Sequence, residues 1–112
     1  MRKRVNWEGV FPAVTTQFRP DLSLDIDATA RVMEGLIRDG VSGLIVCGTV
    51  GENCSLDKAE KIAVMEAGKA VARGRVPVIS GIAEFTSAFA IDMAEEAARI
   101  GLDGVMVMPA LV

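Results

Sequence analysis

Residues 43–47 read Gly43-Leu44-Ile45-Val46-Cys47, and every position after the glycine is apolar. An uninterrupted apolar run of this length is typical of a parallel strand that is buried on both faces. Residues 38–46, which contain most of this run, align with residues 99–107. Each segment reads as a helix end, a Gly-x-x-Gly turn and a buried strand, which indicates a partial internal repeat. The sequence therefore predicts a strand–helix module that occurs more than once.

Strands and helices are expected to alternate along the chain. Short apolar segments predict strands at residues 10–15, 43–47, 76–80 and 105–108. Three helices should separate these strands, because capping residues and helical spacing of apolar residues mark each interval. The second interval carries a capping box, in which an Asp and a Glu stand three residues apart. The predicted helix boundaries are Asp25 to Gly40, Asp57 to Gly74, and Thr86 or Ser87 to Gly101.

This alternation predicts an α/β fold with a parallel sheet and right-handed crossovers. A (β/α)8 TIM barrel needs about 250 residues, so four strands with three helices come close to half of one. We therefore expect residues 1–112 to form the N-terminal half of a TIM-barrel domain. Four residues follow the strand predicted at 105–108, so we expect this strand to present an uncovered apolar edge.

The composition excludes several classes of function. The chain has 112 residues, of which 51% are hydrophobic and 24% charged, and its formal net charge is −3. These values indicate one globular domain rather than a disordered chain. A net negative charge with 4% aromatic residues argues against nucleic-acid binding. No apolar run reaches the length of a membrane span, so we expect a cytoplasmic protein with neither a nucleic-acid nor a membrane partner.

The cysteines and the absence of histidine limit the available chemistry. Two cysteines, Cys47 and Cys54, fit a reducing compartment. Without histidine, neither a Cys–His zinc site nor a Cys–His nucleophile pair can form, and we expect no metal and no cofactor. Cys47 lies inside a predicted buried strand and should belong to the core. Cys54 lies in the following loop and is a candidate substrate contact.

The loop after the strand at 43–47 is the strongest candidate for a ligand site. In a parallel barrel, ligands bind at the carboxyl ends of the strands. This loop reads Gly48-Thr49-Val50-Gly51-Glu52-Asn53-Cys54-Ser55. Two glycines around Thr49 allow a tight turn whose N–H groups could bind a carboxylate. A plain strand–helix turn, with the Thr49 hydroxyl bonded to the backbone, is the alternative.

The motif Gly48-Thr49-Val50-Gly51-Glu52 resembles the G-T-T-G-E signature of the dihydrodipicolinate synthase and N-acetylneuraminate lyase family. Residues 9–16 resemble the first strand of that family, 75–81 the third and 101–109 the fourth. The resemblance therefore covers nearly all of the chain, with four matches in the right order.

The resemblance implies a chemistry. Members are (β/α)8 barrels, usually tetrameric, in which a lysine on strand six forms a Schiff base with pyruvate or another 2-oxo acid. It implies that Thr49 and the backbone of Val50 bind the substrate carboxylate, and that Thr49 also relays protons. Val50 replaces the commoner second threonine, so a hydroxyl contact is lost while the N–H contact remains. The partners implied are a small-molecule substrate and other copies of the chain.

The Schiff-base lysine is absent from this sequence. The lysines are Lys3, in the N-terminal tail, and Lys58, Lys61 and Lys69, on the helix after the motif. We expect the last three to face solvent. The tyrosine and lysine that the family carries on strands five and six have no counterpart here, so we expect the 112-residue chain alone to be inactive.

Two further residues lie where the fold could use them. Glu84 follows the strand at 76–80, on the face where a barrel binds its ligands, and is either a candidate substrate contact or a charge at the start of a helix. Trp7 precedes the first strand and should close the bottom of the barrel or lie in an interface.

The end of the fourth strand bears on the substrate. Synthases of the family usually carry Pro-Tyr-Tyr there, whereas this chain has Pro109-Ala110-Leu111, which lacks both hydroxyls. The resemblance then favours 1-pyrroline-4-hydroxy-2-carboxylate deaminase, with dihydrodipicolinate synthase or a pyruvate-dependent aldolase as the alternative. A non-catalytic half-barrel that pairs with its own copy is a third interpretation. A phosphate-binding barrel is disfavoured, because such sites follow strands seven and eight.

Overall fold

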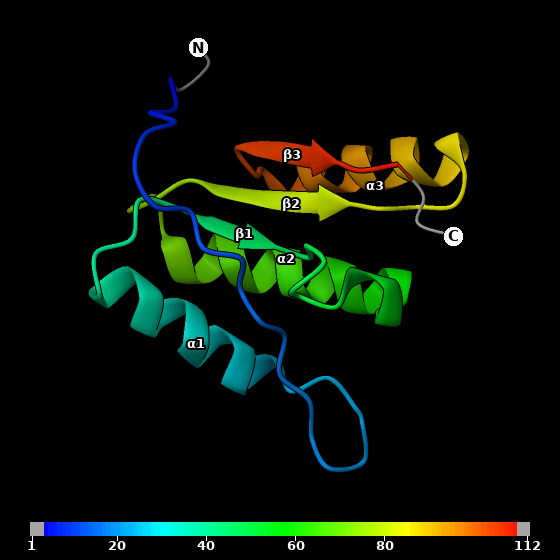
Figure 1. Ribbon diagram of the computed structural model, residues 1–112, viewed down its shortest axis with the longest axis horizontal. Helices are drawn as coiled ribbons and strands as arrows, with labels where there is room; N and C mark the ends of the chain where they lie inside the picture. Colours follow the sequence, from blue (N-terminus) through cyan, green and yellow to red (C-terminus); the bar gives the residue numbers. More distant parts are fainter. Residues whose placement is uncertain (1–3, 110–112) are drawn as a thin grey trace.

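The computed structural model describes residues 4–109. Its centre is a parallel sheet in the order β1-β2-β3, made of β1 (Leu44–Val46), β2 (Val78–Ile82) and β3 (Gly104–Val107). All three arrows point the same way in Figure 1, so their carboxyl ends share one edge. The register pairs Leu44 with Val78, and Ile79 with Gly104.

Three helices join and cover the strands: α1 (Ile26–Arg38), α2 (Lys58–Ala72) and α3 (Ser87–Ile100). Helix α2 packs against α1, β1 and β2, and α3 packs against α2, β2 and β3 (Figure 1). A short 3-10 helix, η1 (Asn53–Ser55), precedes α2. The sheet and helices enclose one apolar core, whose largest fully buried members are Met33, Leu44, Met65, Val14, Val46, Val64 and Val78.

The predicted helix caps are confirmed by hydrogen bonds. The Asp25 carboxylate accepts from the Ala28 N–H at 3.0 Å, and Asp57 and Glu60 form the predicted capping box. Thr86, rather than Ser87, caps α3, because its hydroxyl accepts from the Phe89 N–H. At the other end of α3, Gly101 adopts a left-handed conformation that glycine tolerates without strain.

The first predicted strand, at residues 10–15, is only partly confirmed. It runs parallel to β1 through a single bridge between Ala13 and Ile45, and no regular strand forms. The Val14 N–H donates to the Ile45 carbonyl, and the Ile45 N–H donates to the Pro12 carbonyl. Pro12 has no N–H to donate, which interrupts the ladder after one bridge.

Strand β2 begins two residues later than residues 76–80 predict. Pro77 again lacks an N–H, and the first N–H of the strand, on Val78, is bound by the Asp103 carboxylate at 2.8 Å. Strand β3 begins at Gly104, one residue before its predicted start. Its Val105, Met106 and Val107 side chains are 41%, 41% and 64% exposed. Helix α3 contacts β3, but among residues 4–109 no further strand pairs with its outer side, as expected for an uncovered edge.

The N-terminal arm crosses the amino ends of the strands. Its rings, Trp7 and Phe11, lie 6.0 Å apart between centroids. A Cβ on Gly43 would lie 2.2 Å from the Phe11 ring, and one on Gly104 would lie 3.3 Å from the Trp7 ring. These two glycines occupy equivalent places in the internal repeat. Each is followed by a strand and faced by an aromatic ring. Trp7 thus lies at the amino end of β3 and is 56% exposed, which is compatible with the bottom of a barrel and with an interface.

A Gly43→Ala substitution tests this packing. We expect it to lower the free energy of unfolding by about 1–3 kcal/mol, because the new methyl group overlaps the Phe11 ring. Gly35→Ala is the matched control, since no atom lies within 4 Å of its Cβ position and it stands inside α1. It should stabilise the chain by about 0.5–1 kcal/mol. Urea unfolding measures both, and equal effects would contradict the packing.

Candidate functional site

The loop that follows β1 folds into a tight turn at the carboxyl edge of the sheet. Cys47 and Glu52 have φ angles of 54° and 60°, so two left-handed residues bracket the turn. The Glu52 N–H donates to the Thr49 carbonyl at 3.0 Å, and the Asn53 N–H donates to the Gly48 carbonyl at 3.2 Å. Left-handed backbone is unfavourable for residues other than glycine, so the surrounding contacts must hold this shape.

This turn leaves donors available. Among residues 4–109, the N–H groups of Thr49, Val50 and Gly51 have no hydrogen-bond acceptor. Thr49 and Val50 are exposed, at the edge where the strands end, whereas Gly51 is buried. Consecutive unpaired N–H groups in a turn with left-handed residues are suited to bind an anion such as a carboxylate. The predicted roles of Thr49 and Val50 therefore fall on a backbone that is able to perform them.

The Thr49 hydroxyl is not used by the turn itself. Its Oγ1 donates to the Sδ of Met108 at 3.7 Å, a weak contact that reaches across to the residue after β3. A plain turn would instead bond this hydroxyl to the nearby backbone. The hydroxyl thus lacks, among the described residues, the backbone bond that the structural interpretation expects, and its role in binding stays a prediction.

The prediction that Lys61 faces solvent is wrong. Lys61 is 6% exposed, and its Nζ lies 2.7 Å from the Oε1 of Glu84. The buried residues of α2 recur at helical spacing, and Lys61 is the first of them: Lys61, Val64, Met65, Gly68 and Ala72. This spacing places position 61 on the stripe that faces the sheet. The helical spacing of the apolar residues already indicated that position 61 is buried. We expected exposure because a lysine usually lies at the surface.

The other two lysines of α2 are exposed, as predicted. Lys58 lies 2.6 Å from the Asp92 carboxylate, and Lys69 donates to the Gly101 carbonyl at 3.0 Å. Hydrogen bonding to Asp92 raises the pKa of Lys58. Each α2 lysine therefore has an oxygen partner already, which does not favour a role as a free amine nucleophile.

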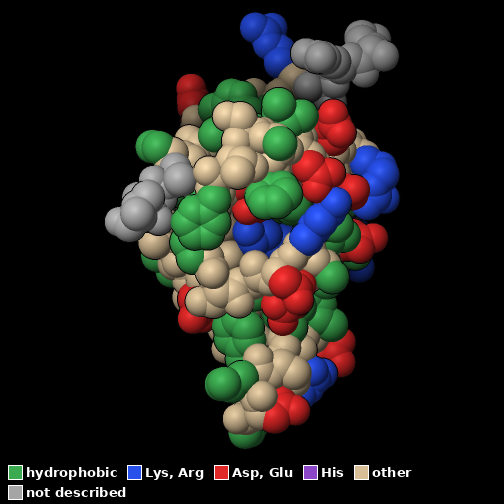
Figure 2. Space-filling model, turned by 90° about the vertical axis from the view of Figure 1, so that its right-hand side faces the viewer, with side chains coloured by type: hydrophobic (Ala, Val, Ile, Leu, Met, Phe, Trp, Pro, Cys, Tyr) green, Lys and Arg blue, Asp and Glu red, His purple; other side chains and the backbone are tan. Residues whose placement is uncertain are grey.

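Glu84 follows β2 on the predicted face, and its carboxylate is paired with Lys61. This pair borders a hollow of about 400 Å³ between the starts of α2 and α3. Figure 2 views the carboxyl-end side of the molecule, where basic and acidic side chains lie next to each other among hydrophobic ones. Helix α3 has no acidic residue in its first turn, so the observed role of Glu84 is to pair with Lys61 of α2, which neither predicted interpretation included. Its contact with substrate stays a prediction.

The two cysteines differ as the sequence predicts. Cys47 is 1% exposed, and burial raises the pKa of its thiol to about 11. Its Sγ donates to the Lys61 carbonyl at 3.8 Å, so the thiol belongs to the packing beneath the loop. Cys54 is exposed in η1, and its contact with substrate stays a prediction.

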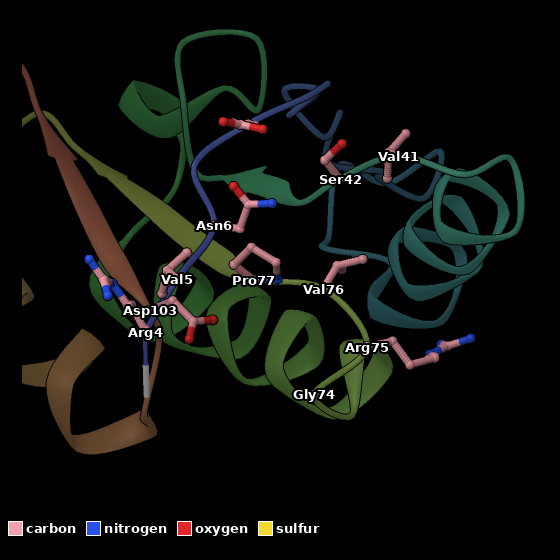
Figure 3. Close-up of a pocket in the computed structure, with 11 residues that line it drawn as sticks. Arg4, Val5, Asn6, Val41, Ser42, Gly74, Arg75, Val76, Pro77 and Asp103 are labelled. Atoms are coloured by element: carbon pink, nitrogen blue, oxygen red, sulfur yellow. The ribbon is translucent and has the colours of Figure 1, made fainter. Parts of the chain in front are cut away.

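A second hollow, of about 460 Å³, lies at the opposite end of the strands. Figure 3 shows its side chains, which come from the N-terminal arm and from the turns before β1, β2 and β3. Arg4 and Arg75 stand at the two ends of this row and point away from each other (Figure 3). The guanidinium groups do not converge on an anion, and parallel barrels bind ligands at the other end.

Sequence reasoning missed two buried polar residues beside the turn, Thr16 and Asn53. The Thr16 Oγ1 donates to the Gly51 carbonyl at 2.7 Å, and the Asn53 Nδ2 donates to the Cys47 carbonyl at 2.8 Å. Neither residue belongs to a periodic pattern. Only the path of the loop brings them to these carbonyls, so the sequence carries no signal for either contact.

Fold and candidate site together define a class: a partial (β/α)8 barrel with a tight turn, at the carboxyl ends of its strands, whose N–H groups could bind an anion. The family model of the dihydrodipicolinate synthetase family matches residues 6–110. The chain belongs to this family, which confirms the resemblance and the half-barrel fold.

Relatives and solved structures agree with this assignment. The 4-hydroxy-tetrahydrodipicolinate synthase of Sorangium cellulosum is 43% identical over 89% of this chain and 34% of its own length. An uncharacterised DapA-like lyase of Rhizobium meliloti is 36% identical over 97% of this chain and 36% of its own. Dihydrodipicolinate synthase DapA-2 of Bacillus anthracis superimposes with a TM-score of 0.86 at 30% identity, covering 95% of this chain and 37% of that one.

A fourth match was solved with a ligand. The Escherichia coli K12 prophage protein YagE, of the dihydrodipicolinic acid synthase family, was crystallised in complex with pyruvate. It superimposes with a TM-score of 0.86 at 33% identity, over 92% of this chain and 35% of that one. The chain thus spans about a third of the length of the proteins it matches. The names of the relatives favour the synthase alternative over the deaminase.

Within residues 4–109, no helix is both long enough and apolar enough to span a bilayer.

Proposed function

We propose that this chain supplies the carboxylate-binding turn of a lyase that forms a Schiff base with a 2-oxo acid. The observation that carries the proposal is the turn between Cys47 and Glu52, with its three available N–H groups and the exposed Thr49 hydroxyl. In support, YagE was crystallised with pyruvate, and several relatives are named as synthases.

The chain's own residues would bind and orient the substrate. The N–H groups of Val50 and its neighbours would hold the carboxylate, which places the ketone carbon beside an attacking amine. The amine adds to that carbon, and water leaves as the imine forms. The Thr49 hydroxyl would pass a proton to the departing oxygen. Because the α2 lysines are already paired or bonded, and Lys3 precedes the first strand whereas the resemblance implies a lysine on strand six, we assign the amine to a lysine outside these 112 residues.

Synthase chemistry, the condensation of pyruvate with aspartate semialdehyde, is the activity we assign to the protein that contains these residues. The deaminase interpretation rests on Ala110 and Leu111, which lie outside the described residues. It is therefore carried by sequence resemblance alone, while the curated relatives carry the synthase name.

The assay offers both substrates to that protein. We expect condensation of pyruvate with aspartate semialdehyde, and no ammonia from 1-pyrroline-4-hydroxy-2-carboxylate. Ammonia release without condensation would replace the synthase with the deaminase. If neither reaction occurs and pyruvate forms no imine, the non-catalytic half-barrel becomes the better interpretation.

We also propose that the protein works in the cytoplasm as a homo-oligomer, and as a tetramer if it follows the family. The free Cys47 and Cys54 fit a reducing compartment. The apolar side chains of β3 are exposed, which favours contact with another apolar surface. That surface could belong to the rest of the same polypeptide or to a second copy.

A further inference from the structure

We propose that Thr16 and Asn53 are positioning residues that hold the turn of residues 47–53 in its anion-binding shape. The inference rests on the proposed function, and it adds two residues that neither the motif nor the family match assigns. Both side chains bond to carbonyls of the turn, one on each side of the three available N–H groups.

Thr16 holds the far side of the turn. It is 5% exposed, and its hydroxyl donates to the Gly51 carbonyl at 2.7 Å. Gly51 itself lies close to the segment that bridges to β1, because a Cβ there would lie 2.9 Å from the Val14 carbonyl oxygen. The segment of residues 14–16 is therefore the surface against which the turn closes, and Thr16 provides its one side-chain bond to that turn.

Asn53 holds the near side. It is 2% exposed, its Nδ2 donates to the Cys47 carbonyl at 2.8 Å, and its N–H donates to the Gly48 carbonyl. Cys47 is left-handed, and a Cβ on Gly81 would lie 2.4 Å from its carbonyl oxygen. The Cys47 carbonyl can lie this close to β2 only because position 81 is a glycine. The Asn53 side chain supplies the hydrogen bond that this carbonyl accepts.

The three N–H groups between these contacts can bind an anion tightly only if they are held in place beforehand. Two left-handed residues make the turn unfavourable by itself. Removing either side-chain bond should let the turn relax, which exposes the bonded amides of Glu52 and Asn53 and weakens carboxylate binding. A mainly structural role would lower overall stability without this local effect.

The test begins with amide hydrogen exchange of the 112-residue chain, read at Glu52 and Asn53. We expect Thr16→Val to speed exchange at both amides about five- to tenfold, as loss of one buried hydrogen bond predicts. Thr16→Ser keeps the hydroxyl and should stay within about twofold of the wild type. Asn53→Leu, which keeps the size without the donor, should resemble Thr16→Val.

Ser42→Ala is the control. The Ser42 hydroxyl accepts a hydrogen bond from the Val10 N–H at 3.0 Å, at the opposite end of the strands from the turn. Its loss should leave exchange at Glu52 and Asn53 unchanged relative to residues elsewhere in the chain. Unchanged exchange in Thr16→Val, or equal acceleration in Ser42→Ala, would overturn the inference.

Kinetics of the lyase that contains the chain give the second readout. Thr16→Val should raise KM for pyruvate about five- to tenfold and leave kcat within about twofold, and Thr16→Ser should restore KM. An unchanged KM would also overturn the inference. If the wild-type protein does not act on pyruvate, the proposed function fails, while the exchange experiment still decides whether Thr16 and Asn53 hold the turn.

Discussion

Thr49→Val is expected to lower kcat/KM of the lyase that contains this chain by about 10²-fold or more, the usual range for loss of a proton-transfer group. The free energy of unfolding should change by less than about 1 kcal/mol, because the hydroxyl is exposed and bonds only weakly, to the Met108 sulfur. Valine has the shape of threonine and leaves the backbone N–H groups of the turn in place. Steady-state kinetics and urea unfolding measure the two effects separately.

Ser55→Ala provides the control for Thr49→Val. Ser55 is another exposed hydroxyl residue of the same loop, and it lies in η1, beyond the turn. Its loss should leave both kcat and stability near those of the wild type. If Thr49→Val instead keeps wild-type kinetics, the hydroxyl takes no part in proton transfer, and the loop is the plain turn that the sequence also allows.

Lys61→Met is expected to lower the free energy of unfolding of the chain by about 3–5 kcal/mol. Lys61 and Glu84 are both largely buried and lie 2.7 Å apart, so removing the ammonium leaves a carboxylate without its partner in a poorly solvated position. This loss is large compared with the stability of a typical domain, which is about 5–15 kcal/mol. Urea unfolding, followed by circular dichroism, measures it.

Two further variants test whether the loss of stability comes from burial of the Lys61–Glu84 pair or from the removal of any lysine charge. The double variant Lys61→Met with Glu84→Leu should recover most of the lost stability, because it removes both charges and leaves apolar side chains. Lys58→Met breaks the exposed pair with Asp92, which water screens, so it should lower the free energy of unfolding far less than Lys61→Met does. Equal losses for Lys61→Met and Lys58→Met would contradict the burial of Lys61.

Local patterns predicted most of the fold. The apolar run at 43–47 and its repeat at 104–107 identified two of the three strands, and Asp25 and Asp57 identified the starts of two helices through side-chain bonds that act within a few residues. The ends of the strands were less predictable near Pro12 and Pro77, because proline has no backbone N–H to donate to a neighbouring strand. The length of a strand depends on the N–H and carbonyl groups of the strand beside it. That neighbour is distant in the sequence, so a local pattern does not predict where pairing stops.

The site was predicted less completely than the fold. Thr49 and Val50 could be found because a glycine-bracketed turn follows a buried strand at the end where barrels bind ligands. Lys61 was misread, because a lysine on a buried stripe is compatible with the fold only when a distant carboxylate, here Glu84, meets it. Thr16 and Asn53 were missed for a similar reason, since their partners are backbone carbonyls that come close only in the folded chain.

Borohydride reduction in the presence of pyruvate, followed by peptide mass spectrometry, tests most directly whether this chain holds the carboxylate while another segment supplies the amine. In a polypeptide of these 112 residues, we expect no pyruvate adduct on Lys58, Lys61 or Lys69, because each is bound to an oxygen partner. In the lyase that contains the chain, we expect one adduct per subunit on a lysine outside these residues. A stoichiometric adduct on Lys58, Lys61 or Lys69 would contradict this division of the site.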